Sequence, residues 1–284
     1  MEIIALAENE TTGIPGLVGE HGLALLVLAA ERRILFDTGA SGALVSNAKA
    51  LGLENALAQV DAIVVSHGHY DHSGGLAAVL NHVRRPTPVH VRPGFFASRL
   101  TVRTGTHKSI GIPFDRAYLE SHGARFVEEN AARELLPGFW LTGEIPLREE
   151  TEVGEAGLQL GAVEDSTVAD PFTDEQALAV ATQAGLAVLV GCSHRGLVNS
   201  ILAAKVAAGA DAVHIVFGGA HLRSTTDAHN RWAARRVHEL AARVALGHCT
   251  GKPAEACFAQ VFGARFRRLQ TGWRWGDVQA DPSA

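Results

Sequence analysis

Short apolar runs recur along the first third of the chain, and the segments between them show helical periodicity. The runs predict β-strands because each spans about four to eight residues and is bounded by turn-forming residues. They lie at residues 2–7, 23–30, 33–36, 62–66 and 88–91, and the second and third form a hairpin. Helices are predicted at residues 42–51 and 74–83, the second with Ser73 as its N-cap.

The second half of the chain alternates strands with helices, which is typical of the α/β fold class. Strands are predicted at residues 177–182, 186–190, 212–217 and 244–246. Helices are predicted at residues 197–208 and 226–242, and from Pro253 to Gly263. The helix at 226–242 carries one apolar stripe, formed by Ala233, Val237, Leu240 and Val244.

Residues 94–137 break this regular pattern. Residues 95–100 are interpreted as helical, and residues 101–112 as a surface loop that contains Gly105, Lys108 and Gly111. Loops of this length in compact proteins tend to be functional or mobile. We therefore expect a substrate lid inserted around residues 94–137.

Composition restricts the partners that we expect. Hydrophobic residues make up 47% of the 284 positions and charged residues 19%, which describes a globular protein with an ample core. The net charge of -5 and the scattered basic residues argue against a nucleic-acid partner. Three unevenly spaced cysteines favour a reduced, cytoplasmic setting over a disulfide framework. The N-terminus lacks the basic start of a signal peptide, and the apolar run at 23–30 is too short to span a bilayer, so we expect no membrane partner.

A polar residue follows directly after each of five predicted strands. These residues are Asp37, His67, His194, His221 and His248. In α/β sheets, ligands bind beyond the carboxyl ends of the strands. The pattern therefore predicts that the five side chains converge on one edge of the structure.

Residues 66–75 concentrate the metal-binding chemistry. Zinc and related cations bind imidazole nitrogens and carboxylate oxygens. Alternate residues of an extended loop point the same way, so His67 and His69 can chelate one ion while Asp71 and His72 face a neighbouring position. Each ion needs a further ligand from elsewhere in the chain. The best candidates are His194 and His248.

The segment Asp37–Gly39, followed by the sequence HGHYDH from His67 to His72, strongly resembles the metallo-β-lactamase superfamily and its HxHxDH signature. Further stretches are similar to one branch, named for the dihydropterin–ribofuranosylaminobenzene phosphate synthase. They are Glu20–Gly22, Ser66–Leu76, Thr142–Pro146, Gly191–His194, Gly218–Leu222 and His248–Gly251. The resemblance implies a four-layer αββα sandwich with a dinuclear metal site at its edge, here as a single domain over residues 1–284.

Two features depart from the common lactamase pattern. The segment with Pro-Gly-His that usually supplies a third ligand is absent, and so is the strand-end Gly-Asp whose carboxylate bridges the metals. Gly191–His194 stands in that general place, and we assign His194 as a ligand. Whether a carboxylate bridges the ions stays open.

Together with the resemblance, these patterns assign His67, His69 and His194 to one ion and Asp71, His72 and His248 to the other. One or two divalent ions are expected; zinc is the first expectation, and manganese and iron are the alternatives. Asp71 also counts as a catalytic residue.

Five further residues complete the candidate site. His221 is expected to contact a substrate phosphate or act as a general acid, against a structural role. Asp37 either caps a turn or receives an N–H from a ligand histidine. Lys108 could contact an anionic substrate, and Thr250 begins a helix start that could hold phosphate. Cys192 is either a small buried hydrophobe or a ligand or nucleophile beside the metals.

The expected function is a metal-dependent hydrolase that uses a metal-bound hydroxide on a small phosphoester-type substrate. One alternative is a transferase of the synthase type that names the branch, with a phosphorylated or pterin-like substrate. The others are a nucleic-acid-processing enzyme, which the acidic balance disfavours, and a non-enzymatic metal-dependent binding protein. The sequence leaves the substrate and the oligomeric state open, a homo-oligomer included.

Overall fold

The computed structural model describes residues 1–29, 31–103, 106–152, 157–161 and 167–276. Ala30, the last residue of one predicted strand, lies outside these ranges, as do Thr104 and Gly105 of the predicted loop and the last eight residues of the expected domain, 277–284. Within the described ranges, no helix combines the length and the apolar character needed to cross a bilayer.

The first half of the chain, joined by one strand from residues 274–276, forms a seven-stranded sheet in which β3, β4, β5 and β8 run parallel. In spatial order its strands are β18 (Arg274–Gly276), β1 (Glu2–Ala7), β2 (Ala24–Ala29), β3 (Arg32–Phe36), β4 (Ala62–Val64), β5 (Thr87–Val91) and β8 (Ala124–Glu128). Its helices are α1 (Ala43–Ala50), α2 (Glu54–Ala58), α4 (Leu76–Val83) and α5 (Arg116–Ser121).

The second half forms another seven-stranded sheet, in which β14, β15, β16 and β17 run parallel. In spatial order its strands are β17 (Phe266–Arg268), β16 (Ala241–Leu246), β15 (Val213–Gly218), β14 (Gly185–Leu189), β13 (Leu178–Thr182), β10 (Phe139–Leu141) and β9 (Arg133–Leu136). Its helices are α6 (Leu197–Ala208), α7 (Asp227–Leu240) and α8 (Lys252–Phe262), and a 3-10 turn (Gly263–Arg265) follows.

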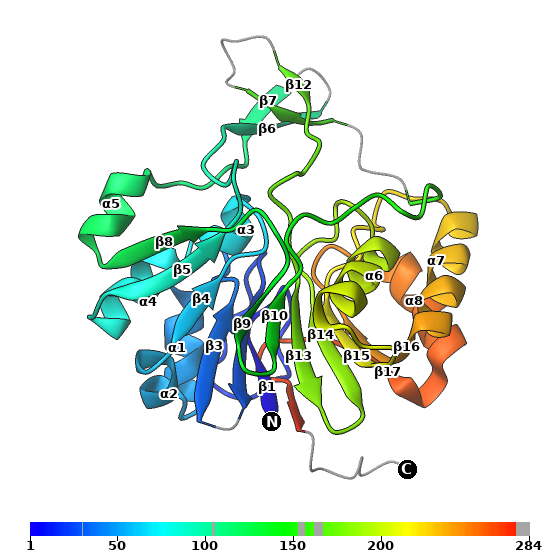
Figure 1. The fold of residues 1–284 in the computed structure, drawn as a ribbon, viewed down its shortest axis with the longest axis horizontal. Helices are drawn as coiled ribbons and strands as arrows, with labels where there is room; N and C mark the ends of the chain where they lie inside the picture. The colour runs from blue at the N-terminus through cyan, green and yellow to red at the C-terminus, as the bar shows by residue number, and fades with distance from the viewer. Residues whose placement is uncertain (30, 104–105, 153–156, 162–166, 277–284) are drawn as a thin grey trace.

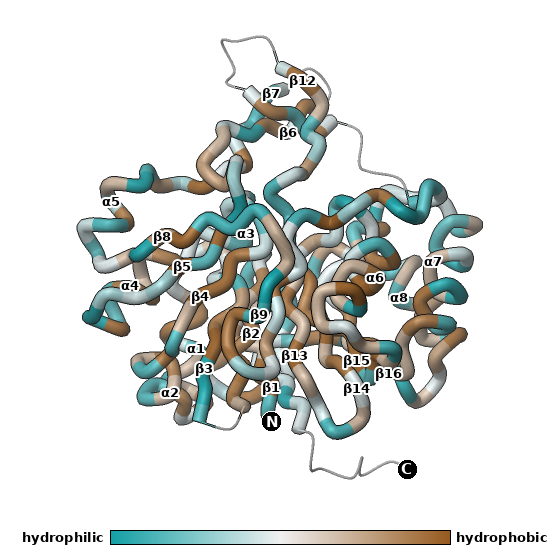
Figure 2. Tube along the Cα trace, viewed as in Figure 1, coloured by the Kyte–Doolittle hydropathy of each residue, from teal (hydrophilic) through white to brown (hydrophobic). Residues whose placement is uncertain are grey.

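The two sheets pack face to face with helices outside, so the chain forms the four-layer αββα sandwich that the resemblance implied (Figure 1). Three apolar cores lie between the four layers. Strand β2 shows why its run has no polar face: Leu26 packs toward the helices, and Leu25 and Val27 pack toward the other sheet. Figure 2 shows the same division, with apolar strands inside and polar residues on the outer sides of the helices.

A third sheet of four strands stands outside the layers, on the same side of the molecule as the short helix α3 (Tyr70–Ser73) (Figure 1). Its strands are β12 (Val168–Ala169), β11 (Leu158–Leu160), β6 (Arg99–Arg103) and β7 (Thr106–Ser109). The prediction of a helix at 95–100 is wrong, since a turn there leads into β6. The described part of the predicted loop 101–112 is largely the hairpin of β6 and β7. Most of the remaining residues of 94–137 belong to the main layers, because they form α5, β8 and β9.

Two predicted helix boundaries are also wrong. Ser73 is not the N-cap of the helix that follows, because it ends α3 and its hydroxyl donates to the His69 carbonyl at 2.7 Å. Helix α4 begins after Gly75, where a Cβ would lie 2.0 Å from the Thr38 carbonyl oxygen. Val244 lies in β16 and not on the helical stripe, because a spacing of four positions also keeps a residue on one face of a strand.

Candidate metal centre

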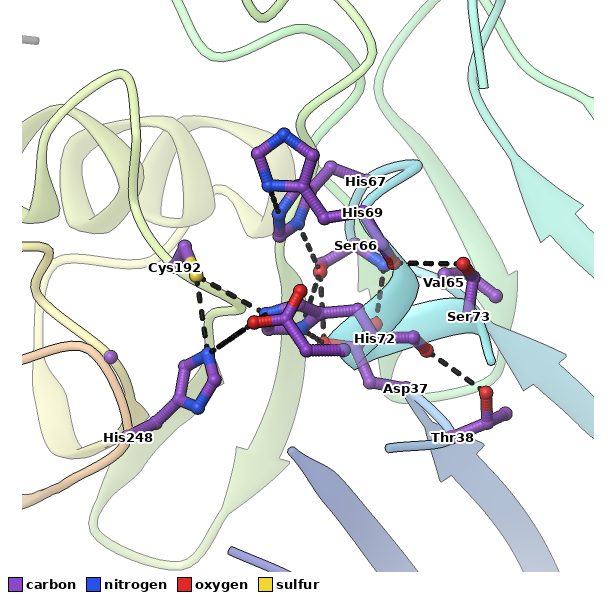
Figure 3. Close-up of polar contacts among 12 residues, drawn as sticks. Asp37, Thr38, Val65, Ser66, His67, His69, His72, Ser73, Cys192 and His248 are labelled. Atoms are coloured by element: carbon purple, nitrogen blue, oxygen red, sulfur yellow. Dashed lines mark hydrogen bonds and ion pairs between the residues drawn. The ribbon is translucent and has the colours of Figure 1, made fainter. Parts of the chain in front are cut away.

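The loop between β4 and α4 is held against the end of β3 by one carboxylate. Asp37 Oδ1 accepts the Ser66 backbone N–H at 2.7 Å, and Oδ2 accepts the Ser66 hydroxyl at 2.8 Å. The same Oδ2 lies 2.7 Å from His72 Nδ1. With Nδ1 bonded to Asp37, the Nε2 atom of His72 is directed into the site (Figure 3).

Three imidazoles that were assigned to one ion lie together. His67 Nε2 is 3.1 Å from His69 Nδ1, and both ring centroids are 4.8 Å from that of His194. Both ring nitrogens of His194 and the Nε2 atom of His69 are buried, with no hydrogen-bond partner among the described residues. Buried polar atoms are almost always satisfied, so these nitrogens fit a bound cation.

The residues assigned to the second ion form a separate cluster. His72 Nε2 lies 3.1 Å from His248 Nε2, and Asp71 Oδ2 lies 3.5 Å from His248 Nε2. These three donors come from α3 and from the end of β16, segments that only the fold brings together. The cluster contains imidazole nitrogens and a carboxylate, which suit zinc, manganese or iron.

Cys192 lies closer to both clusters than the sequence suggested. Its Sγ atom is 3.2 Å from His72 Nε2 and 3.3 Å from His248 Nε2 (Figure 3). Its donor atom also lies within 4.8 Å of those of His67 and His194. The signal for this position is Gly191-Cys192 directly after a strand, in the general place of the Gly-Asp of the common lactamase pattern.

His21 is a contact that sequence reasoning missed. Its Nε2 atom lies 3.2 Å from Asp71 Oδ2, and its ring stacks on that of His248 with centroids 5.0 Å apart. His21 belongs to the segment Glu20–Gly22, which carried part of the resemblance but received no role. Its side chain is about half exposed, so it stands at the solvent side of the second cluster.

Buried carboxylates hold the ligand loops through their backbone, and the sequence pattern did not reveal them. Glu175 accepts the N–H of His194 and of Arg195, each at 2.7 Å. Asp174 accepts the N–H of Gly68 at 2.8 Å, and Glu8 accepts that of His248. Burial raises the pKa of Glu175 to about 7 and that of Asp174 to about 6.

Electrostatics favour neutral imidazoles in the first cluster and charged groups in the second. Burial lowers the pKa of His69 to about 3 and holds the pKa of His67 and of His194 well below the usual range. Burial also lowers the pKa of His72, but the carboxylates of Asp37 and Asp71 outweigh it and raise the pKa. Neutral imidazole is the form that binds metal.

A cavity of about 340 Å³ opens beside the clusters and is roofed by the third sheet. Its polar lining includes Lys108, whose Nζ atom lies 5.9 Å from the Tyr70 ring centroid. His221 also lines it, with its ring centroid 4.2 Å from that of His194. A larger cavity of about 610 Å³ elsewhere is lined by none of the candidate ligands.

Thr250 does not line this cavity. It is fully buried, its hydroxyl accepts the Ala220 N–H at 3.1 Å, and its own N–H donates to the Gly247 carbonyl at 2.9 Å. The N–H of Thr250 itself is therefore already bonded and is not free for a phosphate. Thr250 instead ties the loop after β15 to the loop after β16.

Strained backbone is concentrated around the centre. Asp37, Ser193, His221 and His248 all have positive φ, from 49° to 59°. A fifth residue, Phe172, has φ of 51° and stacks on His194 with centroids 4.1 Å apart. Such conformations cost about 1–3 kcal/mol each and cluster at functional sites.

Comparisons with known proteins agree on the family. The family described as "Metallo-beta-lactamase superfamily" matches residues 17–168. The chain is 29% identical to 7,8-dihydropterin-6-methyl-4-(beta-D-ribofuranosyl)-aminobenzene-5'-phosphate synthase of Methanocaldococcus jannaschii, over 96% of this chain and 95% of that protein. It is also similar to the crystal structure of Tm1679, a metal-dependent hydrolase of the beta-lactamase superfamily, with 28% identity, a TM-score of 0.81, and 97% and 98% of the two chains covered. Zinc-bound PqqB from Methylobacterium extorquens shares the fold, with 13% identity, a TM-score of 0.51, and 97% and 100% covered.

Proposed function

The chain belongs to the metallo-beta-lactamase superfamily and is an enzyme of that superfamily, and we propose that it is a metal-dependent hydrolase of a small phosphorylated substrate. The observation that carries the proposal is the pair of ligand clusters beside one cavity. His67, His69 and His194 would hold one ion, and Asp71, His72 and His248 the other. The buried, unbonded nitrogens of His194 support this, since a cation would satisfy one of them.

Divalent ions held in this way polarise a phosphoryl oxygen and lower the pKa of a coordinated water. Zinc is the proposed metal, because imidazole and carboxylate donors suit it, and metal analysis would distinguish it from manganese and iron. Around the ions, the protein's own groups orient the ligands. Asp37 holds the His72 ring through Nδ1, and Ser66 Oγ lies 2.9 Å from His67 Nδ1.

Cationic and proton-donating groups line the cavity next to these clusters. Lys108 and Arg223 would contact the negative charge of a substrate phosphate. His221 lies beside His194 and would donate a proton to the leaving oxygen. We propose that the third sheet forms the expected lid, since Thr101, Lys108 and Leu158 of this sheet, and Ile110 directly after β7, line the cavity. This lid would exclude water from the bound substrate.

A second candidate is a transferase like the synthase of Methanocaldococcus jannaschii. The favouring observations are the 29% identity over nearly the whole chain and the rings of Tyr70 and His21 at the cavity, with centroids 6.4 Å apart. Flat aromatic groups there could contact a pterin ring. Such an enzyme would join two substrates, whereas a hydrolase would add water to one.

Metal content and product analysis test the proposal together. The purified protein, reconstituted with zinc, is compared with His67→Ala and with His82→Ala, a control on α4 whose imidazole contacts Glu54 O outside the cavity. We expect metal and phosphoester hydrolysis in the wild type and in the control, and loss of both in His67→Ala. A wild type without bound metal would contradict the proposal. Mass spectrometry after incubation with a pterin diphosphate and an aminobenzene riboside phosphate would reveal the joined product of a transferase.

A further inference from the structure

We propose that the Cys192 thiolate is a ligand shared by the two metal ions, an inference that rests on the two-metal function proposed above. Cys192 is the one residue, within the described part of the chain, that belongs to all three groups of candidate donors. One group joins it to Asp71, His72 and His248, another joins it to His67 and His194, and a third joins it to His221 and Cys249. In each cluster all donor atoms lie within 4.8 Å of one another.

The contacts on the second-ion side are the shorter ones. Cys192 Sγ lies 3.2 Å from His72 Nε2 and 3.3 Å from His248 Nε2, and these two nitrogens are 3.1 Å apart. Donors that share a tetrahedral ion at about 2.0–2.3 Å lie about 3.3–3.8 Å from one another. The three atoms therefore already form a triangle close to the face of a coordination tetrahedron.

An independent observation points to a cation on the other side of the sulfur. His194 is 4% exposed, and neither of its ring nitrogens has a hydrogen-bond partner among the described residues. One of these nitrogens lies within 4.8 Å of Cys192 Sγ and of a ring nitrogen of His67. A cation between the three donors would satisfy a buried polar ring that the protein itself leaves unbonded.

A bound cation would favour a thiolate at the shared position, whereas burial and the neighbouring Cys249 by themselves raise the pKa of the Cys192 thiol. Among the donors of the two clusters in the described chain, Asp71 is the one carboxylate, and it belongs only to the second cluster. The first ion would otherwise be held by neutral imidazoles alone. Metal binding breaks the S–H bond, forms a sulfur–metal bond and releases the proton to solvent, so no oxidant or reductant is required.

The backbone conformation on either side of Cys192 directs its Sγ atom toward the two clusters. A Cβ at Gly191 would lie 2.1 Å from Ser66 Oγ, so only glycine lets the end of β14 pack against the ligand loop. Ser193, on the other side, has φ of 59° and its hydroxyl donates to the Gly219 carbonyl at 2.8 Å. These two constraints fix the direction of the Cys192 side chain between them.

X-ray absorption spectroscopy tests the proposal directly. The zinc-loaded wild type and the control Cys257→Ser, altered at a partly exposed cysteine, should both show a sulfur neighbour of zinc at about 2.3 Å. Cys192→Ser should lose that sulfur and bind zinc at least about tenfold more weakly. Cys192→Asp should retain metal without sulfur, because a carboxylate can also bridge. Circular dichroism of the metal-free variants establishes that each is folded.

The outcomes separate this inference from the function on which it rests. Zinc-loaded wild type that shows only nitrogen and oxygen neighbours overturns the thiolate ligand and leaves the metal site intact. An unchanged sulfur signal in Cys192→Ser also overturns it, and would indicate Cys249 instead. A wild type that binds no metal under reconstitution overturns both proposals. With cobalt in place of zinc, a near-ultraviolet thiolate band present in Cys257→Ser and absent in Cys192→Ser supports the inference independently.

Discussion

The two donor clusters differ in how far the protein itself satisfies them. In the second cluster, His72 is bonded to Asp37, and Asp71 contacts both His21 and His248. In the first cluster, His194 is buried with unbonded ring nitrogens in the described structure. The second cluster therefore carries its own charge compensation, whereas the first depends on a cation. Within one site, protein contacts can thus stabilise the histidines of one cluster while a bound cation stabilises those of the other.

The largest expected effect comes from removing one ligand of each cluster. His194→Ala and His248→Ala should each lose about one metal ion per chain and lower kcat/KM by about 10³, or about 4 kcal/mol. Elemental analysis and steady-state kinetics measure both quantities, with His82→Ala as the matched control. If His194→Ala keeps its metal content and activity, the first cluster is not a metal site.

In the metal-free protein, replacing a histidine of each cluster should change the free energy of unfolding in opposite directions. His72→Phe leaves the buried Asp37 carboxylate without its imidazole partner and should lower the free energy of unfolding by about 3 kcal/mol. His194→Phe removes unbonded polar nitrogens beside Phe172 and should raise it by about 1 kcal/mol. Urea denaturation in the presence of a chelator measures both. Equal losses in the two variants would contradict the difference between the clusters.

The free energy of unfolding should also depend on pH through Glu152, which contacts the start of α6. Burial raises the pKa of Glu152 to about 7, and its carboxylate accepts the N–H groups of Val198 and Asn199 at the start of α6. Between pH of about 4.5 and about 7 the folded state keeps a proton that the unfolded state has lost. Stability should therefore fall by about 3 kcal/mol as the pH rises through this window.

Chemical denaturation at several pH values measures this slope. The variant Glu152→Gln cannot ionise, so its free energy of unfolding should lack the Glu152 contribution in the same window. The comparison uses the difference between wild type and variant, which removes the contribution of other titrating groups. An identical pH slope in the two proteins would show that Glu152 does not titrate in this way.

The smallest expected effect comes from the exposed cavity wall that β7 provides. Lys108 is exposed on β7, so replacing it by alanine should raise KM for a phosphorylated substrate about three- to tenfold and leave kcat nearly unchanged. Lys49→Ala, on the exposed side of α1, is the control. A loss in kcat with unchanged KM would instead indicate that Lys108 acts in the chemical step.

Local patterns were sufficient for most strands and helices of the main layers and for the residues of the ligand loop, whereas the four-layer arrangement followed from the family resemblance. Apolar runs such as Leu25–Val27 identify strands that are buried on both faces, and the spacing from His67 to His72 is a property of one short segment. The third sheet was missed because β7 (Thr106–Ser109) is exposed throughout and has no apolar alternation. Its pairing β6–β11 joins residues that are more than fifty positions apart.

The sequence by itself determined which side chains could bind metal, because imidazoles, a carboxylate and a thiol were placed directly after apolar strands. Only the tertiary structure decided how these donors are shared. Cys192 reaches both clusters because the ends of β4, β14 and β16 meet at one edge. Glu175, Asp174 and Glu8 hold the ligand loops by accepting backbone N–H groups, and every residue except proline carries such a donor. A pattern of side chains therefore cannot reveal them, whereas the packing of distant segments does.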